Sequence, residues 1–142
     1  MSDSVYQAAI MALAKSANNN GDITDATARC QRSNPLCGDE IILAAVTDTM
    51  SLHRLAHRTR GCVLCKAATT KMLQLAAQYP QQSTLHKMCR DVIHMFGEKK
   101  IIASMDVFTP VIEHPARYGC VQLPFEALID ILQCGKHKED NY

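Results

Sequence analysis

The hydrophobic pattern of the chain changes its period at Gly61 and Cys62, and this change restricts the folds that the chain can adopt. Before it, three short segments favour strands because they alternate or are rich in β-branched apolar residues; they cover residues 26–33, 40–47 and 51–59. After it, apolar residues recur at helical spacing until Tyr79 and Pro80. This order predicts an α+β fold, in which a small three-stranded antiparallel sheet packs against several helices.

Two other helices in the first hundred residues are predicted from their boundaries. Residues 4–16 have helical spacing, and the asparagines before Gly21 end that pattern. Ser83 is expected to cap a later helix, which ends before Gly97.

The C-terminal part of the chain is expected to hold two more helices. The first is a short helix before Pro110, within residues 98–117. The second begins at Pro124, which suits a first helical position, and ends at Gly135. Residues 136–142 are predicted to form a solvated tail.

Length and charge limit the organisation and the partners of the protein. The 142 residues suit one domain, and no linker rich in Pro, Gly or Ser divides residues 1–142. The balance of 15 Lys and Arg against 14 Asp and Glu argues against nucleic acid or an anionic membrane as a partner. The N-terminal stretch lacks a basic signal region, and no apolar run approaches the about 20 residues of a membrane span. We therefore expect a cytoplasmic protein whose partner is a protein or a metal.

The cysteines divide into two groups. There are seven of them, an odd number, which in a reducing compartment indicates metal ligands, reactive thiols and buried apolar residues rather than disulfides. Cys30, Cys89 and Cys134 fall within regular patterns and are expected to fill the core.

Cys37, Cys62 and Cys120 each stand beside a glycine at an expected element boundary. Cys37 lies in the stretch "NPLCGDEI", between two turn-forming pairs, and Asp39 follows it by two residues. Cys62 lies at the start of a helix, where the helix dipole stabilises a thiolate, and Cys120 is expected just before the last helix. These positions suit ligands or nucleophiles better than core filling.

Two metal sites can be built from these residues. A long-range site combines Cys37, Asp39, Cys62 and Cys120, and a local site combines His57, Cys62, Cys65 and a fourth ligand. Either set would hold a tetrahedral zinc ion, and three thiolates with a carboxylate would also hold iron or a labile cluster.

The other histidines are weaker candidates. His53 and His57 are four residues apart on an expected strand, so they should share one face, and that face is expected to meet solvent. His114 is a reserve candidate because it lies close to the segment around Cys120.

The chain resembles the NifU-type iron-sulfur scaffold family, which includes IscU and SufU. The similarity follows three blocks after the first helix, namely "NPLCGDEI", "RGCVLCKAATTKM" and "PARYGCVQLPFEAL". The chain is closer to the SufU branch for two reasons. Gly119 stands where the IscU branch has a histidine before the last cysteine, and the segment between Cys62 and Cys120 is long, as in the SufU branch, whereas it is shorter in IscU.

The resemblance implies a set of site residues and partners. It implies metal or cluster ligands at Cys37, Asp39, Cys62 and Cys120, with Arg117 nearby to balance their negative charge. It implies that zinc or a [2Fe-2S] cluster is bound, that sulfur comes from a cysteine desulfurase, and that apo-proteins or cluster carriers receive the product. By the same resemblance, Cys37 is the first choice of sulfur acceptor and Cys120 the second. The protein would then be a scaffold rather than an enzyme, or at most a zinc-dependent sulfurtransferase.

Two other functions fit part of the sequence. A thiol-disulfide oxidoreductase would use Cys62 and Cys65 at the helix start. A zinc-stabilised interaction module would use the same ligands as the scaffold without chemistry of its own. Cys65 departs from the pattern of the family, and a thiol one helical turn from Cys62 would either pair with it or replace it as a ligand.

Overall fold

The computed structural model describes residues 7–18, 21 and 23–140, with side chains as far as residue 133. The elements in chain order are α1 (Ala8–Lys15), β1 (Ala28–Asn34), β2 (Asp39–Thr47), β3 (Leu52–Arg60), α2 (Val63–Gln78), α3 (Gln82–Glu98), η2 (Ala103–Glu113), η3 (Pro115–Arg117) and α4 (Tyr118–Asp140). The expected start of the first helix, at residues 4–6, lies outside the described residues.

The three strands form an antiparallel meander in the order β1-β2-β3, and this confirms the predicted α+β fold. The first hairpin closes with Asn34 opposite Asp39, and the bounds of the strands differ from the expected ones by one or two residues. Ile41, Leu43 and Ala45 alternate along β2 and are fully buried, because they face the helices.

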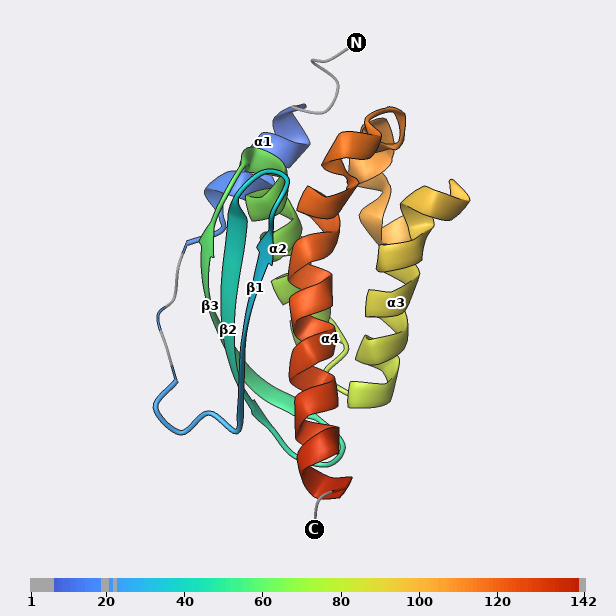
Figure 1. Cartoon of the computed structure of the whole chain (residues 1–142). Coiled ribbons are helices and arrows are strands. Elements are labelled where there is room, and N and C mark those ends of the chain that lie inside the picture. Colours follow the sequence, from blue (N-terminus) through green and yellow to red (C-terminus); the bar gives the residue numbers. More distant parts are fainter. Residues whose placement is uncertain (1–6, 19–20, 22, 141–142) are drawn as a thin grey trace.

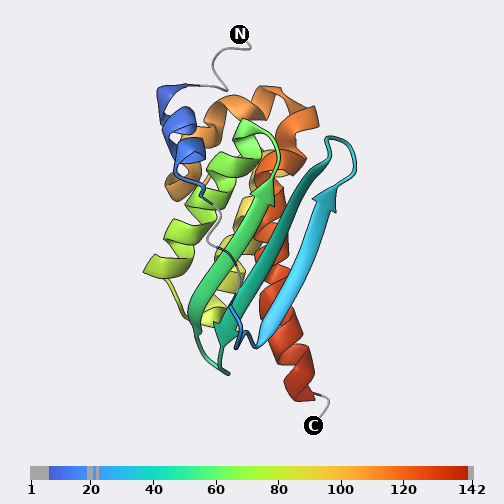
Figure 2. The same cartoon turned by 90° about the vertical axis from the view of Figure 1, so that its left-hand side faces the viewer.

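The helices lie on one side of the sheet (Figure 1). α2 and α4 pack on the strands, α1 packs on α2, and α3 packs on α4 on the side away from the sheet. Figure 2 shows the other face of the sheet, which the segment before β1 crosses; there Ile23 and Ala26 pack on Ala44 and Ala56. Within the described residues, no helix is long and apolar enough to span a membrane.

The start of α3 was not predictable from a capping residue. Ser83 lies inside the first turn, and Gln81 is the N-cap without a side-chain cap bond, so the expected Ser83 cap is wrong. The Gln82 N–H instead donates to the carbonyl of Met50 at 2.8 Å, and the Leu52 N–H donates to Pro80 at 2.8 Å. The turn between β2 and β3 therefore holds the start of α3.

The end of α3 also differs from the expected one. Gly97 lies inside the helix, and Lys99 is the C-cap, with a left-handed φ of 56°. The N–H groups of Lys99 and Lys100 donate to the carbonyls of Phe96 and Met95, which closes the last turn without a glycine.

The last helix begins earlier than expected. α4 starts at Tyr118, so Cys120 lies in its first turn and Pro124 lies inside it. Tyr118 stacks on Phe96 of α3 with ring centroids 4.7 Å apart, and Gln122 Nε2 donates to the Ile93 carbonyl at 2.9 Å. These contacts between helices hold the turns ahead of the proline.

The remaining C-terminal expectations are partly wrong. The short helix expected before Pro110 is a 3₁₀ helix, η2, that runs through Pro110. α4 continues past Gly135 to Asp140, so the expected exit at Gly135 is wrong, and residues 136–140 are helical. The exposure of their side chains, and thus the predicted solvated tail, lies outside the described side chains.

The two histidines of β3 do not share a solvent face. His53 is exposed, whereas His57 is 1 % exposed and lies opposite Leu43 on the core face. The pairing register shifts between Val46 and Thr47, and this irregularity breaks the alternation along β3 between the two histidines. The expected exposure of His57 is therefore wrong.

Replacing Gly97 by alanine should stabilise the protein. Gly97 lies inside α3, and a Cβ atom built there meets no atom of the described residues within 4 Å. Gly97→Ala should raise the free energy of unfolding by about 0.5–1 kcal/mol, because alanine loses less backbone entropy on folding. Urea denaturation followed by circular dichroism measures the change, and a loss of stability would contradict the assignment of Gly97 to the helix interior.

Candidate metal centre

Three parts of the chain that carry the predicted ligands meet at one end of the molecule (Figure 1). Cys37 lies in the turn between β1 and β2, and Asp39 is the first residue of β2. Cys62 is the N-cap of α2 directly after β3, and Cys120 lies in the first turn of α4. The sheet and both central helices therefore position this site.

The β1–β2 turn brings Cys37 to α4. The Asn34 carbonyl accepts the N–H groups of Cys37 and Gly38, and Gly38 has a left-handed φ of 76°. A Cβ atom at Gly119 would lie 2.7 Å from Asn34 Nδ2, so a larger residue at Gly119 would displace the Asn34 side chain. This close approach leaves the sulfur atoms of Cys37 and Cys120 3.6 Å apart.

Asp39 joins β2 to the start of α2. Its side chain is 2 % exposed; Oδ1 accepts the Cys62 N–H at 2.9 Å, and Oδ2 lies 3.5 Å from the Cys62 sulfur. A Cβ atom at Gly61 would lie 2.5 Å from Oδ1, so the glycine before Cys62 makes room for the carboxylate. A buried carboxylate is costly without hydrogen bonds, and this backbone donor offsets part of that cost.

The structure brings together the side chains of the long-range set. The ligand atoms of Cys37, Asp39 and Cys120 all lie within 4.8 Å of one another, and Cys62 adjoins them through Asp39. Among the described side chains, no other group of three or more Cys, His, Asp or Glu ligand atoms lies this close.

The local set does not assemble around His57. His57 is buried, and its Nδ1 lies 2.9 Å from the Thr59 hydroxyl, so this ring is part of a buried polar contact. Burial also lowers the pKa of His57.

The thiols of the site differ in their pKa values. A hydrogen bond with Cys120 lowers the pKa of Cys62 to about 7, and the N–H of Cys65 adds to this effect. The same hydrogen bond raises the pKa of Cys120, and burial raises it further. Partial desolvation and the neighbouring Asp39 raise the pKa of the Cys37 thiol. Negative charge therefore gathers first on Cys62.

The other cysteines lie in or against the core. Cys65 is fully buried, and burial raises its pKa. Cys89 is 1 % exposed, with a pKa raised to about 12 by burial, and the Cys30 thiol donates to the Ala127 carbonyl at 3.2 Å. The core positions predicted for Cys30 and Cys89 are confirmed, and the side chain of Cys134 lies outside the described part.

Arg117 and His114 lie close to Cys120 along the chain. Arg117 is half-buried at the end of η3, three residues before Cys120, and its role in balancing charge stays a prediction. His114 is half-buried, and its Nε2 atom has no hydrogen-bond partner among the described residues. Neither side chain belongs to the group of close ligand atoms.

The sequence marks Asn34 and Gly61 as turn and boundary residues, but not their roles in supporting the site. Asn34 shapes the turn of Cys37, and Gly61 makes room for Asp39. Both are part of the quoted blocks, but their roles depend on contacts across the fold that local patterns do not reveal.

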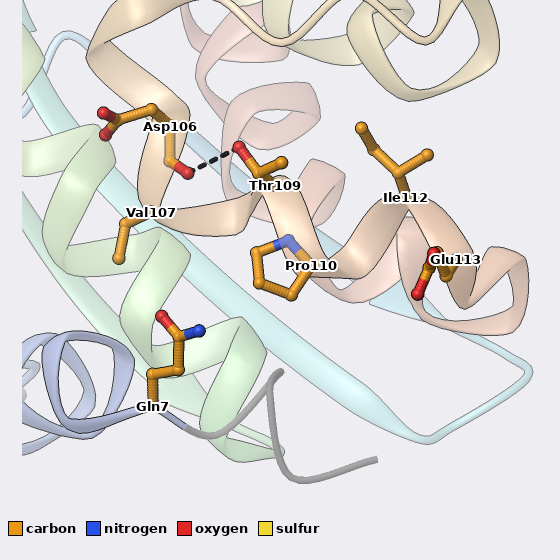
Figure 3. Close-up of a pocket in the computed structure, with 7 residues that line it drawn as sticks. All are labelled: Gln7, Asp106, Val107, Thr109, Pro110, Ile112 and Glu113. Atoms are coloured by element: carbon orange, nitrogen blue, oxygen red, sulfur yellow. Dashed lines mark hydrogen bonds between the residues drawn. The ribbon is translucent and has the colours of Figure 1, made fainter. Parts of the chain in front are cut away.

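The structure also has a pocket of about 530 Å³, whose lining residues include none of the candidate metal ligands (Figure 3). It lies between the start of α1 and η2, and Gln7, Asp106, Val107, Thr109, Pro110, Ile112 and Glu113 line it. The Thr109 hydroxyl donates to the Asp106 carbonyl at 2.7 Å, which holds the turn of η2 at its wall. It contains no thiol and none of the candidate ligands.

The chain is similar to solved structures of the same fold. It aligns with the N-terminal part of a nitrogen-fixing NifU-like protein from Brucella abortus with a TM-score of 0.84 and 21 % identity, covering 96 % of this chain and 97 % of that one. It aligns with SufU from Fervidobacterium islandicum AW-1, named as an iron-sulfur cluster assembly scaffold protein for the SUF system, with a TM-score of 0.82 and 24 % identity, covering 93 % and 99 %. No curated protein matches the chain.

A family model covers most of the chain. The model of the NifU-like N terminal domain matches residues 5–105, which include Cys37, Asp39 and Cys62. Cys120 lies beyond the matched residues, and the fold brings it to Cys37 and Asp39. The chain is therefore a member of the NifU-like N-terminal domain family.

Proposed function

We propose that the protein is a scaffold for iron-sulfur cluster assembly, which binds metal through Cys37, Asp39, Cys62 and Cys120 and accepts sulfur from a cysteine desulfurase. The observation that carries the proposal is the convergence of three thiols and one buried carboxylate from separate elements. Membership of the NifU-like family and the scaffold role named for the SufU relative support it.

The donor set suits two occupants. Three thiolates and a carboxylate provide four ligands for a tetrahedral zinc ion, and thiolates are also the usual ligands of iron in a [2Fe-2S] cluster. Binding of either occupant requires the Cys37 and Cys120 thiols to lose protons, which their raised pKa values oppose until the metal arrives.

Asp39 is the ligand that opens the site. A carboxylate is a harder donor than a thiolate and binds a soft metal less tightly. Asp39 would hold a metal as the weakest of the four ligands, and the hydrogen bond from the Cys62 N–H to Oδ1 keeps its side chain in place. Loss of this ligand would free a coordination position for incoming sulfur or for release of the product.

Cys37 is the sulfur acceptor, because it is the exposed thiol of the group. Its thiolate attacks the terminal sulfur of a persulfide on the desulfurase; the sulfur–sulfur bond of that persulfide breaks, and the desulfurase thiolate leaves. Cys120, 3.6 Å away, is the second candidate acceptor. The finished cluster passes to recipient apo-proteins or cluster carriers, and Arg117 offsets the negative charge of the ligands.

Two alternatives use parts of the same site. A zinc-stabilised interaction module would keep the four ligands and transfer no sulfur. A thiol-disulfide oxidoreductase based on Cys62 and Cys65 leaves the approach of Cys37, Asp39 and Cys120 unexplained.

Single substitutions should divide the cysteines by their role in metal binding. Cys37→Ser, Cys62→Ser and Cys120→Ser should each lower the metal content of anaerobically purified protein about tenfold or more, because each removes a thiolate ligand. Cys65→Ala should keep its metal, and Cys89→Ala is the matched control, since Cys89 is also buried in a helix. Metal and acid-labile sulfide per chain measure the effect. Loss of metal on changing Cys65, but not Cys37 or Cys120, would exclude the long-range site.

Asp39→Ala should make the bound metal or cluster harder to release. Transfer to a competing chelator should slow about tenfold, equivalent to about 1.4 kcal/mol in the barrier, because the weakest ligand no longer opens the site. Stopped-flow absorbance measures the rate, and Asp106→Ala, at an exposed carboxylate of the pocket, is the control. Release at the rate of the parent protein would contradict the role of Asp39.

Addition of the protein to a cysteine desulfurase should separate a scaffold from a zinc module. In the presence of cysteine, the zinc-loaded parent protein should gain one sulfur atom by mass and increase desulfurase turnover at least several-fold. Cys37→Ser should lose this gain, because the exposed thiol is absent. An unchanged desulfurase rate and an unmodified chain would favour the interaction module.

A further inference from the structure

The proposed function leaves the buried thiol of Cys65 without a role, although it lies one helical turn from Cys62. We infer that Cys62 and Cys65 form a redox-active dithiol, which becomes a disulfide as sulfur carried on Cys62 leaves as sulfide. This inference deepens the proposed function and rests on it for the origin of the sulfur.

The backbone at the start of α2 directs the Cys62 sulfur toward Cys65. Cys62 is the N-cap, with φ −74° and ψ 172°, and its Sγ atom accepts the Cys65 N–H at 3.4 Å. That nitrogen is joined to the Cys65 sulfur through only two carbon atoms. The Cys65 thiol therefore starts close to the Cys62 sulfur, and the inference requires that side-chain rotation bring the two sulfur atoms into bonding geometry.

The two thiols differ in access, as the members of a redox pair do. Cys62 is half-buried and contacts the candidate ligand Asp39, whereas Cys65 is fully buried. Of the two, only Cys62 can be reached by sulfur that enters through Cys37, and Cys65 attacks from inside the protein. A Cys-X-X-Cys pair at a helix start uses its outer cysteine as the nucleophile and its inner one to resolve the mixed species.

The release step balances without an external reductant. The persulfide formed on Cys37 first transfers its terminal sulfur to the Cys62 thiolate, and the Cys37 thiolate leaves. Cys65 then attacks Cys62 Sγ, the bond between Sγ and the added sulfur breaks, and the added sulfur departs as hydrosulfide with the Cys65 proton. The added sulfur gains two electrons, and the two cysteine sulfurs each lose one. An external dithiol restores the pair by thiol-disulfide exchange.

This chemistry competes with metal binding. A disulfide removes Cys62 from the candidate ligands, and a metal ion bound to Cys62 blocks the attack by Cys65. The pair therefore acts in the metal-free protein, at the stage when sulfide is needed, and metal should protect it.

The first part of the test does not depend on sulfur transfer. Metal-free parent protein is incubated anaerobically with oxidised glutathione, its free thiols are alkylated in denaturant, and its disulfides are mapped by peptide mass. The expected product is a disulfide between Cys62 and Cys65, and saturation with zinc should lower its yield at least tenfold. No variant is needed for this measurement.

The second part follows the sulfur. Metal-free protein is treated with glutathione persulfide and desalted, and the sulfide it then releases is measured without added thiol. The parent protein should release one sulfide for each Cys62–Cys65 disulfide that it forms. Cys65→Ala should hold its added sulfur until an external thiol is supplied, and Cys89→Ala, the buried control, should behave as the parent.

The outcomes separate this inference from the proposed function. If the chain takes up sulfur but its disulfide maps to Cys37 and Cys120, or to no pair, the dithiol is excluded and the scaffold stands. Release of sulfide by Cys65→Ala at the rate of the parent protein would likewise exclude it. If oxidised glutathione produces the Cys62–Cys65 disulfide but no sulfur is taken up from persulfide or desulfurase, the dithiol is supported and the sulfur-acceptor role fails.

Discussion

The hydrogen bond from the Cys62 N–H to the buried Asp39 carboxylate is the contact on which the site depends. It joins the first residue of β2 to the N-cap of α2, so the sheet and the helix behind it meet at one point. The carboxylate would be expensive to bury without this donor, and Gly61 leaves it the space it needs. Through this one contact, both a carboxylate and a thiol are held in position before any metal arrives.

The second half of the site is brought in by packing. Asn34 shapes the β1–β2 turn, and the turn lies directly on Gly119 at the start of α4, where a side chain would collide with it. α4 is itself held there by the stacking of Tyr118 on Phe96. The proximity of Cys37 and Cys120 is thus a consequence of how α3, α4 and the sheet pack together, although the two residues are far apart in the chain.

Cys62 is common to the proposed metal site and the proposed dithiol. It adjoins Asp39 among the candidate ligands, and its sulfur accepts the N–H of the buried Cys65. Metal binding and disulfide formation at the same sulfur atom would exclude each other. In a protein that holds metal for a time and then gives it up, this competition would link the redox state of the thiols to the occupancy of the site.

The period of the sequence was enough to predict the meander, the helix after Cys62 and the α+β class, because these features follow from local alternation and spacing. The sequence did not predict the two ends of α3 or the start of α4, because contacts between distant elements override the local signals of Ser83, Gly97 and Pro124. It also did not predict the burial of His57, which follows from the shift in strand pairing. For the site, the sequence by itself determined which thiols stand at element boundaries, because glycines and turn residues mark such positions. Only the tertiary structure decided which candidate set lies together and that Cys65 is buried, because side chains from separate segments meet only when the core is packed.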